Sequence, residues 1–477
     1  MRPGAIPEAP EGAITPMRIA IIGAGPAAVA LIDTLTRPGA DVPEITVFDP
    51  APHPWRGRPY APDLDSVLVN VPPALMSVRP DDPQHYASWL GGRGAAYHDP
   101  LLGAPLVPRG LYGEYLEETA EKAVAAGDVR LVPARAVAVT GDLRVRTEDG
   151  REHDTDRLVL CVGSGTPADL YGLGGAPGHI GDPYPLSRTL PDVRPDASVA
   201  IIGSRLTAVD VAVSLAARGH DGPIHLLSRG GMLPHVWQRP DGWRPEHLTP
   251  EAVRALGAEV TLAALRELLR AELDGLGEDL ADLEADLRAA ATEDPAARLR
   301  RQIEEVASPL QARRLLQDAC HTVMPEAWPL LPEADRALLR RHARLAVSVA
   351  SPMVPVNAVR LLSLYDSGQL TSVAGVRSVV SADGGFRIED AGGTRHADVV
   401  VNAVNPPPGS VPAPAAELVA AMLAGRLAAR HPDGGIVPAD PRVHVVGDLR
   451  GGRPFLTGGI PDVAGAAARA ARALMRG

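Results

Sequence analysis

Residues 17–50 read MRIAIIGAGPAAVALIDTLTRPGADVPEITVFDP, which predicts a buried strand, a glycine-rich turn, a helix and a second strand that ends in an acid. Gly23 permits the tight turn, Gly25 lets backbone N–H groups approach a pyrophosphate, and Ala28 lets helix and strand pack closely. Asp49 ends the second strand, where a carboxylate can accept hydrogen bonds from ribose hydroxyls. The order of these features predicts a βαβ dinucleotide site. Its expected cofactor-binding residues are Gly23, Gly25, Pro26, Ala27, Ala28 and Asp49.

The chain repeats this pattern in its second half. Residues 197–218, ASVAIIGSRLTAVDVAVSLAAR, predict another strand and helix, and a strand-like stretch follows at 224–231. Each unit also closes alike, because 127–167 and 368–408 both read as a β-meander, an apolar strand and a Gly/Asn/Pro turn. We therefore predict an α/β protein with two Rossmann-like dinucleotide-binding domains.

A helical insertion and a discontinuous first domain complete the predicted organisation. Residues 249–345 place apolar side chains at helical spacing with charges between them, as in a helical cap with solvated faces. Residues 443–476 supply a further strand, a Gly-Asp pair, a Gly-rich loop and a helix after the second unit closes. We predict a disordered tail at 1–16, a first domain at 17–165 plus 406–477, and a second domain inserted at 166–405.

The composition of the 477-residue chain excludes several chemistries. Two cysteines form no Cys-x-x-Cys pair, and the single lysine, Lys122, lies in a charged helical pattern, so dithiol, lysine-imine and phosphate-loop chemistry are excluded. The 14 histidines show no metal-binding spacing, and we expect no metal. A net charge of −11 without a basic stripe argues against nucleic acid. Because no apolar run would serve as a signal peptide or membrane span, we expect a cytoplasmic protein without membrane contact.

Three further stretches carry a family resemblance: GRPYAPDLDSVLVNVPPALMSVRPDDPQHYASWL at 57–90, GSRLTAVDVAVSLAARGHDGPIHLLSRGGMLPH at 203–235 and MVPVNAVRLLSLYDSGQL at 353–370. With GAGPAA at 23–28 and VGD at 446–448, they resemble flavoproteins with two dinucleotide-binding domains. More narrowly, the chain looks like bacterial FAD/NAD(P)-binding proteins distantly related to flavin N-hydroxylating monooxygenases. That resemblance implies FAD in the first domain, reduction by NADPH, and O₂ and a small molecule as reaction partners.

The resemblance also implies positions around the flavin. Asp448, preceded by Gly447, is expected on the ribityl side, and the backbone at Gly459 and Ile460 is expected against the ring. The ring itself is expected near the loop 70–77. The candidates for catalytic hydrogen bonds to flavin or substrate are Tyr60, Asn70 and Ser77, and Gly163 in the closing turn completes the cofactor set. For Asn70 and Ser77, turn and capping chemistry is the alternative.

The second turn departs from the family pattern Gly-x-Gly-Leu-Thr. Its expected nucleotide-binding residues are Gly203, Ser204, Arg205, Leu206 and Thr207, so Arg205 stands where the family has glycine. Either its guanidinium contacts a phosphate or it fills the pocket and blocks the nicotinamide nucleotide. Arg229 follows the next strand, where it would meet a 2′-phosphate and favour NADP; the alternative is a surface residue in a polar turn.

The preferred hypothesis is an FAD-dependent oxidoreductase, namely an NADPH-dependent monooxygenase that hydroxylates a small, polar, amino-acid-like metabolite. Two alternatives stay open. In one, an FAD oxidase or dehydrogenase is reduced directly by its substrate, as a blocking Arg205 would require. In the other, a non-catalytic protein keeps FAD while its nicotinamide site has decayed. The sequence leaves the oligomeric state, including a homo-oligomer, undecided.

Overall fold

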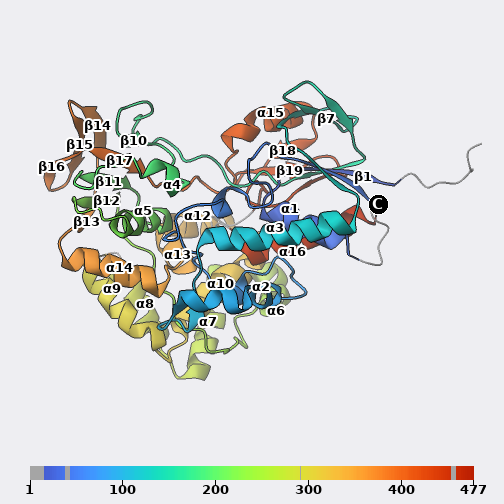
Figure 1. The fold of residues 1–477 in the computed structure, drawn as a ribbon. Coiled ribbons are helices and arrows are strands. Elements are labelled where there is room, and N and C mark those ends of the chain that lie inside the picture. The colour runs from blue at the N-terminus through green and yellow to red at the C-terminus, as the bar shows by residue number, and fades with distance from the viewer. Residues whose placement is uncertain (1–15, 38–42, 291, 453–457, 477) are drawn as a thin grey trace, which may run out of the picture.

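The computed structural model describes residues 16–37, 43–290, 292–452 and 458–476, and the predicted tail at 1–16 lies almost wholly outside these ranges. Two five-stranded sheets lie side by side, with a group of helices below them in the view of Figure 1. The strand orders are β20-β9-β1-β2-β5 and β10-β17-β11-β12-β13. Every neighbouring pair in both sheets is parallel. The predicted fold class, two Rossmann-like units with a helical insertion, is confirmed.

The first sheet is covered on both faces, which explains its continuously apolar strands. Ile19 and Ile21 of β1 pack against helices α1, α3 and α16, whereas Ala20 and Ile22 pack against a β-meander and helix α15. The sheet strands are β1 (Arg18–Ile22), β2 (Glu44–Phe48), β5 (Val129–Val132), β9 (Arg157–Leu160) and β20 (Val443–Val445). The covering elements are α1 (Pro26–Leu35), α3 (Arg109–Ala126), α16 (Ile460–Leu474), β6 (Ala136–Val139), β7 (Arg144–Thr147), β8 (Glu152–Asp154) and α15 (Ala416–Ala424).

The C-terminal part of the chain returns to this sheet. β20 pairs in parallel with β9, and α16 packs on α1. The first unit is therefore built from both ends of the chain, with the second unit between them. The exact boundaries at 165/166 and 405/406 stay predictions. The short elements near the return are η6 (Ala413–Ala415), β18 (Ala428–Arg430) and β19 (Ile436–Pro438).

The second sheet repeats the layering of the first. Val199 and Ile201 of β11 face α5 and α14, whereas Ala200 and Ile202 face a second meander. The sheet strands are β10 (His179–Ile180), β11 (Val199–Ile202), β12 (Ile224–Ser228), β13 (Leu370–Ala374) and β17 (Val399–Asn402). The remaining elements are α4 (Leu186–Thr189), α5 (Leu206–Ala217), α14 (Pro355–Asp366), β14 (Ser378–Ala382), β15 (Gly385–Asp390) and β16 (Gly393–Ala397).

The insertion between β12 and α14 is helical and has its own apolar core around Trp328. It continues to Ala350, slightly beyond the predicted end at 345, because α13 extends toward α14. Its elements are α6 (Pro250–Leu256), η4 (Gly257–Glu259), α7 (Leu262–Leu276), α8 (Leu280–Ala289), α9 (Pro295–Glu304), η5 (Glu305–Ala307), α10 (Ala312–Thr322), α11 (Met324–Ala327), α12 (Glu333–Arg341) and α13 (Ala343–Ala350).

The segment 49–108, between β2 and α3, joins the two units. The indole Nε1 of Trp237 donates to the carbonyl of Asn70 at 2.8 Å, and the amide of Val356 donates to Asp99 at 3.0 Å. Because both contacts cross from the first unit to the second, this segment fixes how the units meet. Its elements are η1 (Arg58–Tyr60), η2 (Pro73–Leu75), α2 (His85–Leu90), η3 (Gly91–Tyr97), β3 (His98–Asp99) and β4 (Ala104–Pro105).

Candidate active site

The first glycine turn has the geometry of a dinucleotide cradle. Gly23 has φ +99°, and a Cβ on it would lie 2.4 Å from the carbonyl oxygen of Cys161. Gly25 is the N-cap of α1, Pro26 opens the helix, and no side chain among the described residues caps it. Ala28 is fully buried, as close packing of helix on strand requires. The helix N-terminus therefore presents its free backbone N–H groups and dipole to a phosphate.

Asp49 holds this turn together. One carboxylate oxygen accepts from the amide of Ala24 at 2.6 Å and the other from the amide of Ala51 at 2.8 Å. A carboxylate oxygen has a second lone pair, so both bonds leave acceptor capacity for ribose hydroxyls. The predicted contact of Asp49 with a ribose stays a prediction, as does that of Gly163, which has φ +77° and open space around its Cα.

Tyr60 belongs to the short helix η1, which follows a glycine packed against this turn. A Cβ on that glycine, Gly57, would lie 3.2 Å from the Cα of Gly25. Burial raises the pKa of Tyr60 to about 12; the positive charge of Arg109 opposes this rise and the negative charge of Asp448 adds to it. The phenol is therefore a hydrogen-bond donor at neutral pH, and Asp448 from the C-terminal segment lies near enough to act on it.

Asn70 keeps one unused acceptor. Its side-chain Oδ1 is buried and has no hydrogen-bond partner among the described residues, whereas its backbone carbonyl is engaged by Trp237. Buried polar atoms are normally paired, so an orphaned oxygen at this point is available to a bound ligand. Asn70 thus remains a candidate for flavin or substrate binding.

Ser77 is already occupied within its own turn. The hydroxyl donates to the carbonyl of Asp82 at 2.7 Å and to that of Arg79 at 3.1 Å, and it accepts from the amide of Arg79. The side chain is buried. These contacts correspond to the turn-and-capping alternative, and the predicted contact of Ser77 with flavin or substrate stays a prediction.

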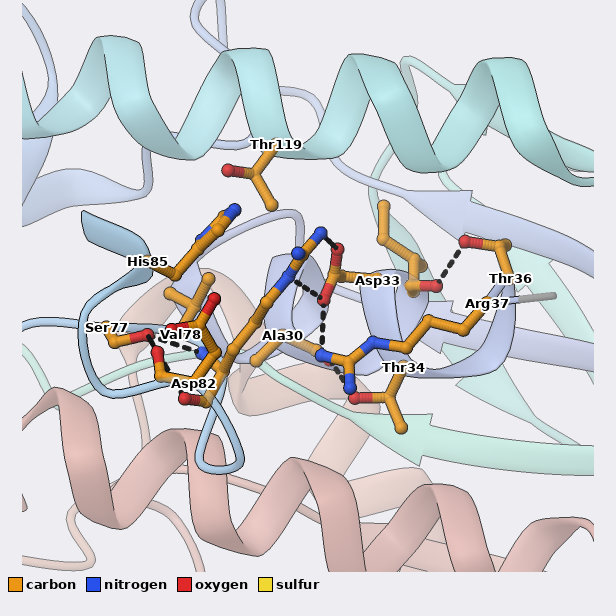
Figure 2. Close-up of polar contacts among 12 residues, drawn as sticks. Ala30, Asp33, Thr34, Thr36, Arg37, Ser77, Val78, Asp82, His85 and Thr119 are labelled. Carbon is orange, nitrogen blue, oxygen red and sulfur yellow. Dashed lines mark hydrogen bonds and ion pairs between the residues drawn. The ribbon is translucent and has the colours of Figure 1, made fainter. Parts of the chain in front are cut away.

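An ion-pair cluster anchors the loop that carries Ser77 (Figure 2). Asp33 of α1 is 5% exposed and accepts two bonds from Arg79, at 2.6 and 2.9 Å, and one from Arg37 at 2.9 Å. Figure 2 shows His85 on the same side of Asp33 as this loop. The position of the segment 76–85 over α1 therefore depends on a buried carboxylate that the motif analysis did not identify.

Replacing Arg79 with alanine tests this anchor. We expect a loss of about 1.5–3 kcal/mol in unfolding free energy, because charged hydrogen bonds to a buried carboxylate are lost while Arg37 still neutralises it. Amide hydrogen exchange should rise in 76–85 and stay unchanged in the second sheet. Arg151→Ala, which removes a largely exposed arginine, is the matched control. Equal exchange in 76–85 in both variants would disprove the anchor.

The C-terminal segment brings a further helix N-terminus to the first unit. Gly447 has φ +98°, and nothing lies within 4 Å of where a Cβ on it would stand. Gly459 is the N-cap of α16 without a side-chain cap among the described residues. Ile460, the first residue of α16, is buried. The residues between them at 453–457 lie outside the described ranges. The roles of Gly447, Asp448, Gly459 and Ile460 toward the flavin stay predictions.

The second glycine turn resembles the first in its backbone. Gly203 has φ +123°, and a Cβ on it would lie 2.8 Å from the carbonyl oxygen of Ala403. Its amide donates to the end of β12 at 2.7 Å, as that of Gly23 donates to the end of β2 at 2.9 Å. Ser204 donates to the carbonyl of Met232, and Thr207 donates to the Asn405 side chain, so both hydroxyls have structural bonds. Leu206 opens α5.

Arg205 is the N-cap of α5 and belongs to a cluster of three arginines. Burial lowers its pKa, and the positive charges of Arg229 and Arg344 lower it further. None of these three guanidinium groups has an ion pair or hydrogen bond within the described ranges. Arg229 and Arg344 are exposed and Arg205 is partly buried. Cations beside a helix N-terminus offer charge and hydrogen-bond donors to an anion. Arg344 comes from α13 in the helical insertion, and periodicity alone gave no signal that this helix reaches the second turn.

A second group that motif analysis missed lies between the two units. The carboxylate of Asp210 on α5 is fully buried and its Oδ2 accepts from Arg109 of α3 and from the hydroxyl of Tyr184, each at 2.5 Å. The Oδ1 atom has no partner among the described residues. Burial alone lowers the pKa of Arg109, but the charges of Asp210 and its neighbours outweigh this and raise it, so this guanidinium stays charged. This ion pair joins α5, the helix that follows the second turn, to α3, where the charge of Arg109 also acts on Tyr60.

The described residues contain neither a membrane-spanning helix nor a metal-binding group. No helix within the described ranges is long and apolar enough to span a membrane. Across the same ranges, no three histidine, cysteine or carboxylate side chains come together in a group that would hold a metal ion.

Sequence comparison identifies the class of the first unit. Residues 20–165, from β1 to the turn after β9, match a family model described as FAD-NAD(P)-binding. This range contains the first turn, Asp49 and the segment that joins the two units. No curated protein matches the chain.

Solved structures share the fold over nearly the whole chain. L-lysine 6-monooxygenase from Pseudomonas syringae superposes with a TM-score of 0.59 at 18% identity, covering 96% of this chain and 99% of that one. The cadaverine monooxygenase of Erwinia amylovora, bound to FAD, gives 0.55 at 16%, covering 96% and 93%. An ornithine N-hydroxylase from Kutzneria, with reduced FAD, NADP⁺ and L-ornithine, gives 0.53 at 16%, covering 96% and 98%. At these identities the likeness is one of fold.

Proposed function

We propose that this protein is an FAD-dependent oxidoreductase that takes reducing equivalents from NADPH and uses O₂ to hydroxylate the amine of a small polar metabolite. FAD, when bound, supplies the redox chemistry, and the chain supplies binding, orientation and exclusion of water. Gly23, Gly25 and the N-terminus of α1 would hold its pyrophosphate, and Asp49 a ribose. Asp448 would lie on the ribityl side.

The observation that carries the NADPH part is the cluster of Arg205, Arg229 and Arg344. NADPH differs from NADH by a 2′-phosphate, and three unpaired guanidinium groups beside the second turn offer it charge and bidentate geometry. Arg229 follows β12, where dinucleotide folds place the group that meets the adenosine ribose. Arg205 at the helix N-cap lies nearer the pyrophosphate.

The substrate class rests on two considerations. The three fold neighbours named above act on lysine, cadaverine and ornithine according to their descriptions, and each of these compounds carries a primary amine. In this chain, the phenol of Tyr60 and the orphaned oxygen of Asn70 lie on the segment that joins the two units. A donor and an acceptor there suit a small ligand with both amine and carboxylate or amide groups.

The decisive experiment begins with the flavin spectrum of the purified protein. NADPH and NADH are then added separately under anaerobic conditions, and O₂ uptake and hydroxylamine formation are measured with lysine, ornithine and cadaverine. We expect fast bleaching by NADPH, slower bleaching by NADH, and amine-dependent hydroxylamine. A protein that binds FAD but is bleached by neither nucleotide contradicts the proposal.

Arg229→Ala should separate the two nucleotides. Loss of a charge-assisted contact to the 2′-phosphate should raise the KM for NADPH by about tenfold or more, because such contacts contribute about 1.5–3 kcal/mol. The KM for NADH should stay unchanged. Arg218→Ala, an exposed arginine at the end of α5, is the control for lost surface charge. An equal rise in the KM for NADPH and for NADH would show that Arg229 does not contact the 2′-phosphate.

Arg205 favours a second candidate, an oxidase or dehydrogenase whose substrate reduces the flavin. Its side chain stands at the N-cap of α5, where a pyrophosphate would approach. The Arg205→Gly variant distinguishes the candidates. If Arg205 binds phosphate, the variant reduces its flavin more slowly with NADPH; if Arg205 blocks the site, NADPH bleaches only the variant.

A further inference from the structure

The first unit concentrates its aromatic side chains in one place. The chain is only 3% aromatic, yet four of its eight tyrosines lie together with Trp89 between η1, α2 and α3. Ring centroids are 4.6 Å apart for Tyr60 and Tyr112, and 4.8 Å for Tyr112 and Tyr86. Tyr115 is 4.8 Å from Tyr86. These distances are those of direct ring contact.

The cluster runs from the candidate flavin site toward the surface. Tyr60, at its inner end, comes three residues after Gly57, which packs against Gly25 of the first glycine turn, and the charge of Asp448 acts on its phenol. Tyr112, Tyr86 and Tyr115 are fully buried. Trp89 is partly exposed, 5.6 Å from Tyr115, and its indole Nε1 donates to Glu118 at 2.7 Å. An unbroken series of oxidisable rings therefore joins the two regions.

Tyr115 has a partner that none of the other members has. Its hydroxyl accepts from the amide of Val78 at 3.2 Å and lies 2.8 Å from Nδ1 of His85. With the imidazole proton on Nε2, Nδ1 accepts the phenol proton of Tyr115. Burial and the charge of Arg79 lower the pKa of His85, which leaves its ring neutral and able to accept a proton at neutral pH. By contrast, the hydroxyl of Tyr112 donates only to a carbonyl, and that of Tyr86 has no partner among the described residues.

We propose that Tyr60, Tyr112, Tyr86, Tyr115 and Trp89 form a conducting chain that removes one-electron oxidising equivalents from the flavin site, with Tyr115 as the residue that holds the radical. An electron leaves Tyr60 for the oxidant, and the resulting electron hole passes through Tyr112 and Tyr86 to Tyr115. The O–H bond of Tyr115 then breaks, its proton moves to His85 Nδ1, and a neutral phenoxyl radical remains. A soluble reductant restores the electron through Trp89, and His85 returns the proton. Oxygen-derived radicals are the class of oxidant that this route would discharge.

The proposal rests on the proposed function, because it requires FAD at the first site. The test uses FAD-loaded protein, light, and an irreversible cobalt(III) ammine acceptor. Light-excited FAD passes one electron from the chain to cobalt(III), which becomes cobalt(II), and electron paramagnetic resonance detects the radical left on the protein. Ring-deuterated tyrosine assigns that radical to a tyrosine. Protein that purifies without FAD contradicts the proposed function itself, before the chain is tested.

We expect a tyrosyl signal in the wild-type protein and its loss in Tyr115→Phe. His85→Phe should also lose it, although Tyr115 is then present, because the proton has no acceptor. Tyr365→Phe, which removes a hydroxyl bound to Ser372 in the second unit, should keep the full signal. In Trp89→Phe the radical should form but decay severalfold more slowly with ascorbate. FAD-loaded protein without a tyrosyl radical, or with equal signals in Tyr115→Phe and Tyr365→Phe, would overturn the proposal.

Discussion

Gly23→Ala should purify without FAD. A β-carbon at this position would lie 2.4 Å from the carbonyl oxygen of Cys161. In addition, a residue with a side chain is strained at a backbone φ of +99°. The left-handed conformation alone costs about 1–2 kcal/mol. The overlap adds to this, because backbone on both sides has to move. Since the turn also aims the N-terminus of α1 at the pyrophosphate, that displacement should abolish flavin binding.

Gly150→Ala is the control that separates the two costs. Gly150 has φ +82°, in the tight turn between β7 and β8, and nothing lies within 4 Å of where its Cβ would stand. This variant therefore carries only the conformational cost of a positive φ, without a steric overlap. It should keep its FAD and show a small fall in Tm. Flavin absorbance per protein and thermal unfolding of the apoprotein measure both quantities. Full flavin content in Gly23→Ala would show that the first turn does not hold the cofactor.

The sequence was sufficient to predict local units and their repetition. Strand, turn and helix follow one another within 30 residues at both Gly23 and Gly203, and each turn has the geometry that its glycine predicts. The return of the C-terminal segment was also predictable, because VHVVGD at 443–448 supplies a strand that the second unit does not need. In the structure that strand joins the first sheet beside β9.

The features that were missed depend on contacts between distant segments. Arg344 lies in α13. The apolar periodicity of that helix shows which face is buried, but it does not show that Arg344 comes near Arg205. In the sequence, Asp33 is one polar residue in an apolar helix. Only the structure shows that it forms an ion pair with Arg79 of the loop.

The pair of Arg109 and Asp210 was also missed, and it joins residues 101 positions apart across the two units. Asp210→Ala should cost about 3–5 kcal/mol of unfolding free energy, since it leaves the Arg109 guanidinium buried without its anion. The loss should appear in thermal and denaturant unfolding of the apoprotein, whether or not a nucleotide is bound.

The double variant Arg109→Met with Asp210→Leu separates stability from positioning. Two apolar side chains of similar size remove both buried charges together, so most of the lost stability should return. What should not return is the alignment that the pair gives between α3 and α5, because packing contacts lack the direction of a charged hydrogen bond. We therefore expect a protein that is stable and binds FAD but is reduced slowly by NADPH. If this double variant is reduced at the wild-type rate, the pair contributes to folding alone, and contacts such as Trp237 with Asn70 and Val356 with Asp99 suffice to align the two units.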